Sequence, residues 1–216
     1  MYLPAHFAET RPEVLAGFIA VQPFGLLVTH DAESGLVADG VPFVLDADPA
    51  GGPGILRAHV ARANPLWRRA ASLSGEVLVV FQGPHGYVSP AWYPGKAEHG
   101  KVVPTWNYVV VQSRGTLRAI DDAAWLHAFV TRLTDRHEKP RPEPWAVSDA
   151  PAEYVGSMLR AIVGIEIVLS AMTGKWKVSQ NRSAADRASV AAGLRNEGAA
   201  AGSALAAEVA GSDTPA

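Results

Sequence analysis

The run Tyr108-Val-Val-Val-Gln-Ser-Arg-Gly-Thr-Leu-Arg-Ala-Ile120 has three consecutive valines after its tyrosine and is long enough to bend or to serve two sheets. A second run, Val77-Leu-Val-Val-Phe81, is apolar at every position, as in a strand that is buried on both faces. Strands of these two kinds are typical of the centre of a β-barrel. They predict a sheet-based core for this chain.

Shorter apolar runs on both sides of these two strands extend the sheet. The turn-forming residues from Asp31 to Gly35 separate two partly β-branched runs, which predicts a β-hairpin. Near the other end of the chain, Glu166 stands among isoleucines and valines that predict a late strand. These further strands are expected at residues 24–30, 35–45, 55–60 and 162–169.

Helices are predicted where apolar residues recur at helical spacing, in two cases behind a capping residue. Asp121 or Asp122 can cap a helix with Trp125 and Phe129 on one face, and Ser183 can cap another that continues to Leu194. Further helices are expected at residues 12–21 and 151–159. Because the strands do not alternate with the helices, the sequence predicts an α+β fold with an antiparallel sheet.

The domain organisation follows from the absence of an internal repeat and of a second apolar core. We expect one domain over residues 1–196 and an Ala/Gly-rich tail over residues 197–216. Leu205 and Val209 are the only larger apolar residues of this tail. Since two such residues offset little ordering entropy, disorder or a loosely attached helix is expected there.

The composition excludes several classes of protein. Cysteine is absent from all 216 residues, which excludes disulfides, thiolate nucleophiles and metal sites that depend on cysteine. The P-loop, G-x-G-x-x-G, G-x-S-x-G and H-E-x-x-H patterns are also absent. No run approaches the roughly 20 apolar residues of a membrane-spanning helix, and the first residues lack a basic export signal. A cytoplasmic protein without a membrane segment is expected.

Positive charge is concentrated in two parts of a chain whose net charge is −2. Residues 57–118 carry eight lysines and arginines against two glutamates, and residues 175–195 carry five against one aspartate. Both stretches can attract phosphate, either on a cofactor or on nucleic acid.

Four segments, taken together, supply cations of these stretches along with aromatic and amide side chains. A flat ligand with a phosphate needs this mixture, because rings pack on its faces, amides bind its polar edge and lysine or arginine binds its phosphate. FMN is such a ligand, but the same mixture suits nucleic acid, and composition does not separate the two. The segments are His59-Val-Ala-Arg-Ala-Asn64-Pro-Leu-Trp67, Tyr87-Val-Ser-Pro-Ala-Trp92-Tyr-Pro-Gly-Lys96, Val103-Pro-Thr-Trp-Asn-Tyr108 and Gly174-Lys-Trp-Lys-Val-Ser-Gln-Asn-Arg182.

These motifs, together with Met1-Tyr-Leu-Pro-Ala-His-Phe7, resemble PaiB-like proteins in order and spacing over about residues 1 to 195. The resemblance implies an FMN-binding split barrel, an antiparallel β-barrel with flanking helices. It also implies a homodimer with flavin sites at the subunit interface. The family carries the label of negative transcriptional regulator.

Carried over motif by motif, the resemblance implies a cofactor-binding set for FMN. Residue chemistry suggests Arg62, Lys96 or Lys177 for the phosphate, Asn107 or Gln180 for the edge of the isoalloxazine, and Trp106 or Trp176 for its face. The whole set is His59, Arg62, Asn64, Ser89, Trp92, Tyr93, Lys96, Thr105, Trp106, Asn107, Lys175, Trp176, Lys177, Gln180 and Asn181.

Three functions are compatible with these motifs. The first is a flavin-dependent oxidoreductase that exchanges electrons with NAD(P)H or a small acceptor. The second is a DNA-binding repressor without redox turnover, although the predicted helices show no helix-turn-helix. The third is a haem-binding split barrel with His59 or His85 as axial ligand. The other histidines receive no function, and no catalytic residue or metal site is predicted.

Overall fold

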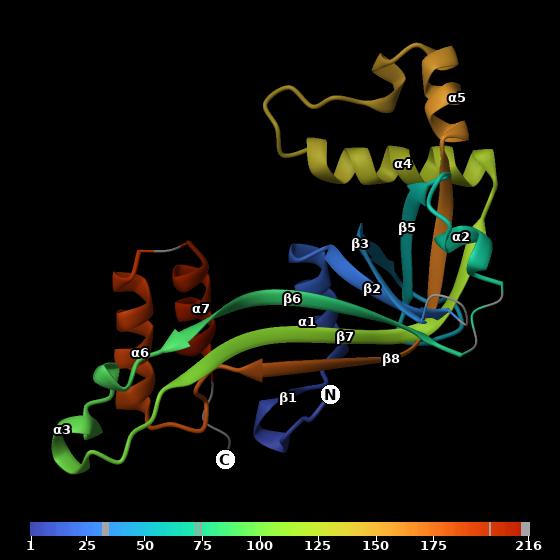
Figure 1. Cartoon of the computed structure of the whole chain (residues 1–216). Coiled ribbons are helices and arrows are strands. Elements are labelled where there is room, and N and C mark those ends of the chain that lie inside the picture. The colour runs from blue at the N-terminus through green and yellow to red at the C-terminus, as the bar shows by residue number, and fades with distance from the viewer. Residues whose placement is uncertain (32–34, 72, 74, 199, 213–216) are drawn as a thin grey trace. The chain divides into compact units, whose positions relative to one another are not determined.

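The computed structural model describes residues 1–31, 35–71, 73, 75–198 and 200–212. Within these residues the chain has eight strands and seven α-helices (Figure 1). The strands are β1 (Ala8–Glu9), β2 (Phe24–Asp31), β3 (Gly35–Pro42), β4 (Val44–Asp46), β5 (Ile55–Ala61), β6 (Val77–Val88), β7 (Thr105–Ile120) and β8 (Ile162–Lys177). The helices are α1 (Pro12–Val21), α2 (Leu66–Arg69), α3 (Gly95–His99), α4 (Ala123–Glu138), α5 (Ala152–Arg160), α6 (Ala184–Asn196) and α7 (Ala200–Gly211).

The strands form one antiparallel sheet in the order β3-β2-β6-β7-β8-β5-β4, with β1 added to β8. The chain divides into two compact units. The first unit comprises Met1–Leu15, Gln82–Val111 and Thr173–Ala216, and the second comprises Ala16–Phe81 and Gln112–Met172. β6, β7 and β8 therefore contribute residues to both units.

The second unit holds the apolar core that the strand patterns predict. Leu27, Leu56, Val79, Phe81 and Ile165 are fully buried in it, as expected where alternate side chains of paired strands point into one core. α4 packs against this sheet, and the ring of Trp125 lies so close to Gly164 that a Cβ there would be 2.3 Å away from it. Asp122 caps α4 as predicted, since its side chain accepts a hydrogen bond of 2.7 Å from the Trp125 backbone N–H.

The first unit contains the far ends of β6, β7 and β8, with β1, α6 and α7. Figure 1 shows α6 and α7 beside each other, joined by a short connection. Ser183 caps α6 by accepting a hydrogen bond of 3.1 Å from the Asp186 backbone N–H, as the sequence predicts.

The composition leaves two alternatives for the last part of the chain, disorder or a loosely attached helix. Residues 200–211 adopt a helix, α7. Leu205 and Val209 are fully buried, and α7 packs against α6. Residues 199 and 213–216 of the predicted tail, and residues 32–34 of the predicted turn, lie outside the described residues.

Two strands extend well beyond their predicted ends. β6 continues to Val88 and β8 to Lys177, through residues that the sequence does not mark as strand. The extension of β8 carries Lys175, Trp176 and Lys177 of the predicted cofactor-binding set into the first unit. No helix among the described residues is long and apolar enough to cross a membrane.

Candidate functional site

A cationic cavity of about 80 Å³ lies in the first unit, near the start of β7 and the end of β8. Five of its lining residues belong to the predicted FMN set. The remaining three, Phe7, Ser179 and Arg182, were not predicted although they stand inside the quoted motifs. The five predicted residues are Tyr93, Thr105, Asn107, Lys177 and Asn181.

Lys177 is held in this cavity by neutral oxygen atoms. Its Nζ donates hydrogen bonds of 2.6 Å to Thr105 Oγ1 and of 2.6 Å to the Trp106 backbone carbonyl. Burial lowers the pKa of Lys177, and the nearby charges of Lys175 and Arg182 lower it further. Among the described residues that line the cavity there is no carboxylate to offset this positive charge.

Tyr93 provides a second sign that the cavity suits a ligand. The residue is 3% exposed, and its hydroxyl group is buried without a hydrogen-bond partner among the described residues. The Arg182 guanidinium lies 5.2 Å from the centre of its ring. A buried hydroxyl without a partner is unfavourable, so a ligand with acceptor oxygens would stabilise it.

A strained residue shapes the edge of the cavity. Ser179 has φ of 65°, in the left-handed region that non-glycine residues rarely adopt, and it is almost fully buried. Asn107, 1% exposed, donates a hydrogen bond of 2.8 Å from Nδ2 to Ser179 Oγ. Backbone strain of this kind is found at functional sites.

The donor set of this cavity fits the phosphate of FMN. It offers two cations, hydroxyl groups and amides without a competing carboxylate, which is the chemistry that binds a phosphate group. Its volume can accept a phosphate but not the three-ring isoalloxazine, so the ring would lie outside it.

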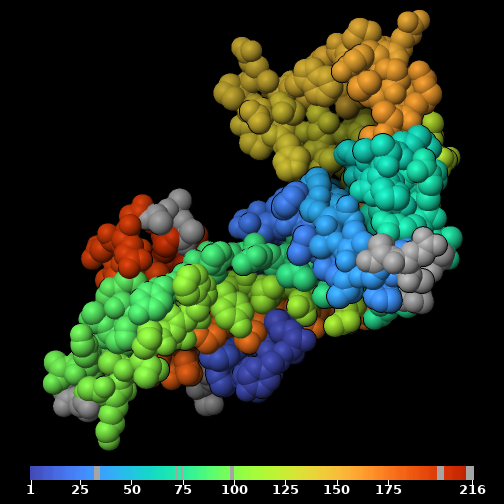
Figure 2. All heavy atoms as spheres, in the orientation of Figure 1, coloured from blue at the N-terminus to red at the C-terminus, as the bar shows by residue number. Residues whose placement is uncertain are grey.

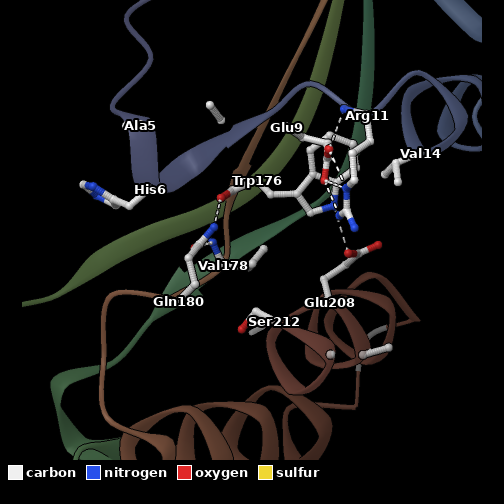
Figure 3. A pocket seen from close by; sticks show the side chains of 13 residues that line it. Ala5, His6, Glu9, Arg11, Val14, Trp176, Val178, Gln180, Glu208 and Ser212 are labelled. Carbon is white, nitrogen blue, oxygen red and sulfur yellow. Dashed lines mark hydrogen bonds and ion pairs between the residues drawn. The ribbon is translucent and has the colours of Figure 1, made fainter. Parts of the chain in front are cut away.

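A larger cavity of about 580 Å³ also lies in the first unit, lined by the N-terminal segment, the end of β8 and α7 (Figure 3). In Figure 3, Glu9, Arg11, Trp176 and Glu208 gather at one end of it, away from His6. Trp176 Nε1 donates a hydrogen bond of 3.0 Å to Glu208 Oε2, while Glu9 and Arg11 form an ion pair.

The two cavities take alternate residues from the end of β8 and the segment that follows it. Trp176 and Gln180 line the larger cavity, whereas Lys177 and Asn181 line the cationic one. The side-chain amide of Gln180 already forms hydrogen bonds within the chain: its oxygen accepts one from the Val178 N–H, and its nitrogen donates one to the Trp176 carbonyl. Trp176 and Gln180 therefore do not meet Lys177 in one cavity.

Other predicted residues of the first unit lie outside both cavities. Trp106 is 50% exposed and stacks on His85 at 5.9 Å between ring centres. Lys175 donates a hydrogen bond to the Tyr2 carbonyl. Ser89 accepts a hydrogen bond from the Ala91 N–H and begins a short 3-10 helix, η2 (Pro90–Trp92). Trp92 and Lys96 line a separate shallow cavity together with Tyr93.

Three residues of the predicted set belong to the second unit and make their contacts there. Arg62 forms two hydrogen bonds, of 2.8 and 2.6 Å, with Asp121. Asn64 donates to Asp39 Oδ1 at 3.0 Å and accepts from the Leu66 N–H, which fixes the start of α2. His59 lines an apolar cavity beneath α4 and α5. The described residues contain no cluster of three or more metal-ligating side chains.

Comparisons with known proteins show the family to which the chain belongs. The family described as "Putative FMN-binding domain" matches residues 1–171. An uncharacterised protein of Emericella nidulans is 36% identical over 239 residues, with 95% of each chain covered. The protease synthase and sporulation protein PAI 2 of Bacillus subtilis is 32% identical over 197 residues, with 91% of this chain and 90% of that protein covered.

A solved structure supports the fold. The FAD and heme binding protein of Mycobacterium smegmatis aligns with a TM-score of 0.57 at 17% identity, over 79% of this chain and 73% of that one. This likeness confirms the predicted α+β class with its antiparallel sheet. Because the family model covers most of the chain and PAI 2 aligns over nearly all of it, the resemblance to PaiB-like proteins is confirmed, and the chain belongs to this family of FMN-binding split-barrel proteins.

Proposed function

We propose that this protein binds FMN and that the cationic cavity beside Lys177 holds the phosphate of the cofactor. The observation that carries the proposal is the partly desolvated ammonium group of Lys177. Both of its hydrogen bonds go to uncharged oxygen atoms, those of Thr105 and of the Trp106 carbonyl. An arriving phosphate would accept a charge-assisted hydrogen bond from Lys177 and one from the buried Tyr93 hydroxyl.

Lys177 is favoured over the two other cations that the sequence suggests for the phosphate. Arg62 is already paired with Asp121 and also donates to the Arg160 carbonyl. Lys96 is exposed on the short helix α3, where a phosphate would remain in contact with water. An ion pair with an exposed lysine contributes little, whereas one in a partly desolvated cavity contributes more.

A comparison of FMN with riboflavin tests the proposal, because riboflavin lacks the phosphate. We expect the protein to bind FMN at least about tenfold more tightly, as one charge-assisted hydrogen bond provides about 1.5–3 kcal/mol. Lys177→Gln should reduce this preference by about the contribution of that one bond and leave riboflavin affinity unchanged. Lys139→Gln, at an exposed position in the second unit, is the matched control. Equal affinities for both flavins in the wild-type protein would contradict the phosphate site.

We further propose that the flavin-bound protein is an oxidoreductase. Bound FMN would supply hydride or one-electron chemistry, for which NAD(P)H and a small acceptor are the partners. The role of the chain is then to hold the phosphate and to leave the ring open to a second molecule. Anaerobic addition of NADH or NADPH should bleach the visible flavin absorbance, and an unchanged spectrum with both donors would contradict the role.

The regulator suggested by the family label receives less support from the structure. Arg57, Arg62, Arg69 and Arg118 of the first basic stretch each face a carboxylate in an ion pair. α6 and α7 are consecutive helices, but Glu208 is the only charged residue of α7. A recognition helix needs cationic or polar side chains for phosphates and bases. The flavoprotein is therefore preferred over a direct DNA reader.

We also propose that the protein is a homodimer, as the resemblance implies. Phe24, Leu26 and Leu36 are 68%, 45% and 75% exposed on β2 and β3, on the face opposite the buried Leu27. Apolar side chains gathered on one face of a sheet are typical of an interface. Sedimentation velocity at micromolar concentration should give a dimer of the 22.8 kDa chain, and a monomer at all concentrations would contradict it.

A further inference from the structure

The helix α5 has a pronounced apolar face but contributes no residue to the core. Tyr154, Val155, Met158 and Leu159 share this face at helical spacing, yet none of them is buried. The segment between α4 and α5 runs back above α4 (Figure 1). In Figure 2, this segment and the two helices form the olive-to-orange part of the surface. These elements enclose a cavity of about 320 Å³ within the second unit.

The lining of this cavity suits an uncharged ligand. Among the described residues that line it there is no aspartate, glutamate, lysine or arginine. Trp145, Tyr154 and Met158 line it while remaining 47%, 57% and 47% exposed, so large apolar side chains stand at its opening. A concave apolar site of this size is in the range that small molecules occupy, whereas a protein partner more often meets a flatter surface.

One polar ring lines the cavity. His59 is half-buried, and its Nδ1 is buried without a hydrogen-bond partner among the described residues. Burial lowers the pKa of His59 and so favours its neutral imidazole form. Its ring packs edge-on against Phe129 at 6.0 Å between ring centres. A neutral imidazole offers one donor and one acceptor to a ligand.

We infer that this cavity binds a small, planar, uncharged aromatic molecule that carries one hydrogen-bonding group. The aromatic part lies among the apolar side chains of α5 and Trp145, and the polar group pairs with His59. This site shares no residue with the cationic cavity of the first unit, and it does not depend on FMN. Failure of one site can therefore be distinguished from failure of the other.

A titration of the full-length protein with the fluorescent probe 2-naphthol tests the inference. We expect saturable binding of one molecule per chain. Met158→Lys should weaken it at least about tenfold, because the substitution removes an apolar side chain from the lining and the probe would partly desolvate the charge that replaces it. Val21→Lys introduces the same charge at an apolar position that is 76% exposed and outside the cavity, and it should bind like the wild type. Both variants should retain the affinity for FMN.

A second pair of measurements tests the role of His59. The wild-type protein should prefer 2-naphthol to naphthalene by about fivefold, the effect of one net hydrogen bond. His59→Phe keeps an aromatic ring but removes both nitrogen atoms, so the preference should disappear while naphthalene still binds. A preference that is unchanged in His59→Phe would overturn the assignment of His59.

Three outcomes would overturn the site as a whole. The first is the absence of saturable 2-naphthol binding to the wild-type protein. The second is equal weakening by Met158→Lys and Val21→Lys, which would show that the probe does not occupy this cavity. If Met158→Lys instead converts a dimer to a monomer in sedimentation velocity, the α5 face is covered by a second copy of the chain, and the small-molecule inference is wrong.

Discussion

Asn107 Nδ2 donates a hydrogen bond of 2.8 Å to the hydroxyl group of Ser179, a residue held at φ 65°. This bond links β7 to the segment that follows β8, within the cationic cavity. Because Ser179 lies between Lys177 and Asn181, its backbone conformation sets where these two residues stand. The strained residue and the proposed phosphate site are thus parts of one local structure.

Substitutions of Ser179 separate the strain from the hydrogen bond. Ser179→Ala loses the bond and keeps the strain, so it should destabilise the fold by about 1–3 kcal/mol. Ser179→Gly also loses the bond but adopts positive φ freely, so it should be more stable than Ser179→Ala by about 1 kcal/mol. Urea unfolding of both variants measures the difference. Equal stabilities would show that the left-handed conformation carries no strain.

Glu166 predicts a specific dependence of stability on pH. It is 2% exposed in β8 and accepts hydrogen bonds from Arg57 at 2.6 Å and from Arg118 at 2.7 Å. Burial would raise the pKa of Glu166, but the two guanidinium groups outweigh burial and hold the pKa below its ordinary 4.5. A lowered pKa in the folded state stabilises the fold above pH 4.5, and this contribution is lost as the pH falls further.

Glu166→Gln should therefore destabilise the protein by about 3 kcal/mol at pH 7, because Arg57 and Arg118 lose their shared partner. The difference from the wild type should shrink as unfolding is measured from about pH 5 down to about pH 3. Glu143→Gln, at an exposed position, is the matched control and should follow the wild type throughout. A difference that stays constant below pH 4.5 would contradict the proposed role of the carboxylate.

Gly164 is required by the packing of α4 on the sheet. A Cβ at this position would stand 2.3 Å from the ring of Trp125, which is itself stacked on Phe129 at 5.1 Å. Gly164→Ala should cost about 1–3 kcal/mol, since the stacked ring has little freedom to move. Gly17→Ala makes the same change within α1, where an added Cβ would meet no atom within 4 Å apart from its chain neighbours and the backbone of the helix. It should stabilise the protein by about 0.5–1 kcal/mol. Thermal unfolding of the two variants should shift in opposite directions.

The sequence predicts the sheet and most helices because local patterns and burial agree over these segments. α1 was expected at residues 12–21 and spans Pro12–Val21, and Asp122 and Ser183 cap the helices that they were expected to cap. The ends of β6 and β8 were not predicted, because their polar and aromatic residues carry no strand alternation. Their extended form follows from pairing with neighbouring strands.

The sequence predicts which residues line the cationic cavity in part, but it does not predict how the predicted residues are distributed in space. Motif resemblance selects Tyr93, Thr105, Asn107, Lys177 and Asn181, and the structure brings these residues together. The resemblance does not show that neighbouring residues at the end of β8 enter different cavities. Successive side chains point to opposite faces only in a strand, and the sequence does not mark residues 170–177 as strand. The resemblance also does not show that Arg62 and Asn64 form hydrogen bonds with aspartates that are distant in the sequence. Their pairing depends on tertiary contacts.

The packing of α7 provides a direct test of the C-terminal structure. Val209 is fully buried in α7, whereas Val103 is 62% exposed in the same unit. Val209→Ala should therefore reduce the free energy of unfolding by about 2 kcal/mol, and Val103→Ala should change it by less than about 0.5 kcal/mol. If the segment were disordered, as its composition suggests, the two substitutions would have equally small effects. Because Trp176 is bonded to Glu208 of α7, Val209→Ala should also weaken the protection of the Trp176 indole N–H from hydrogen exchange.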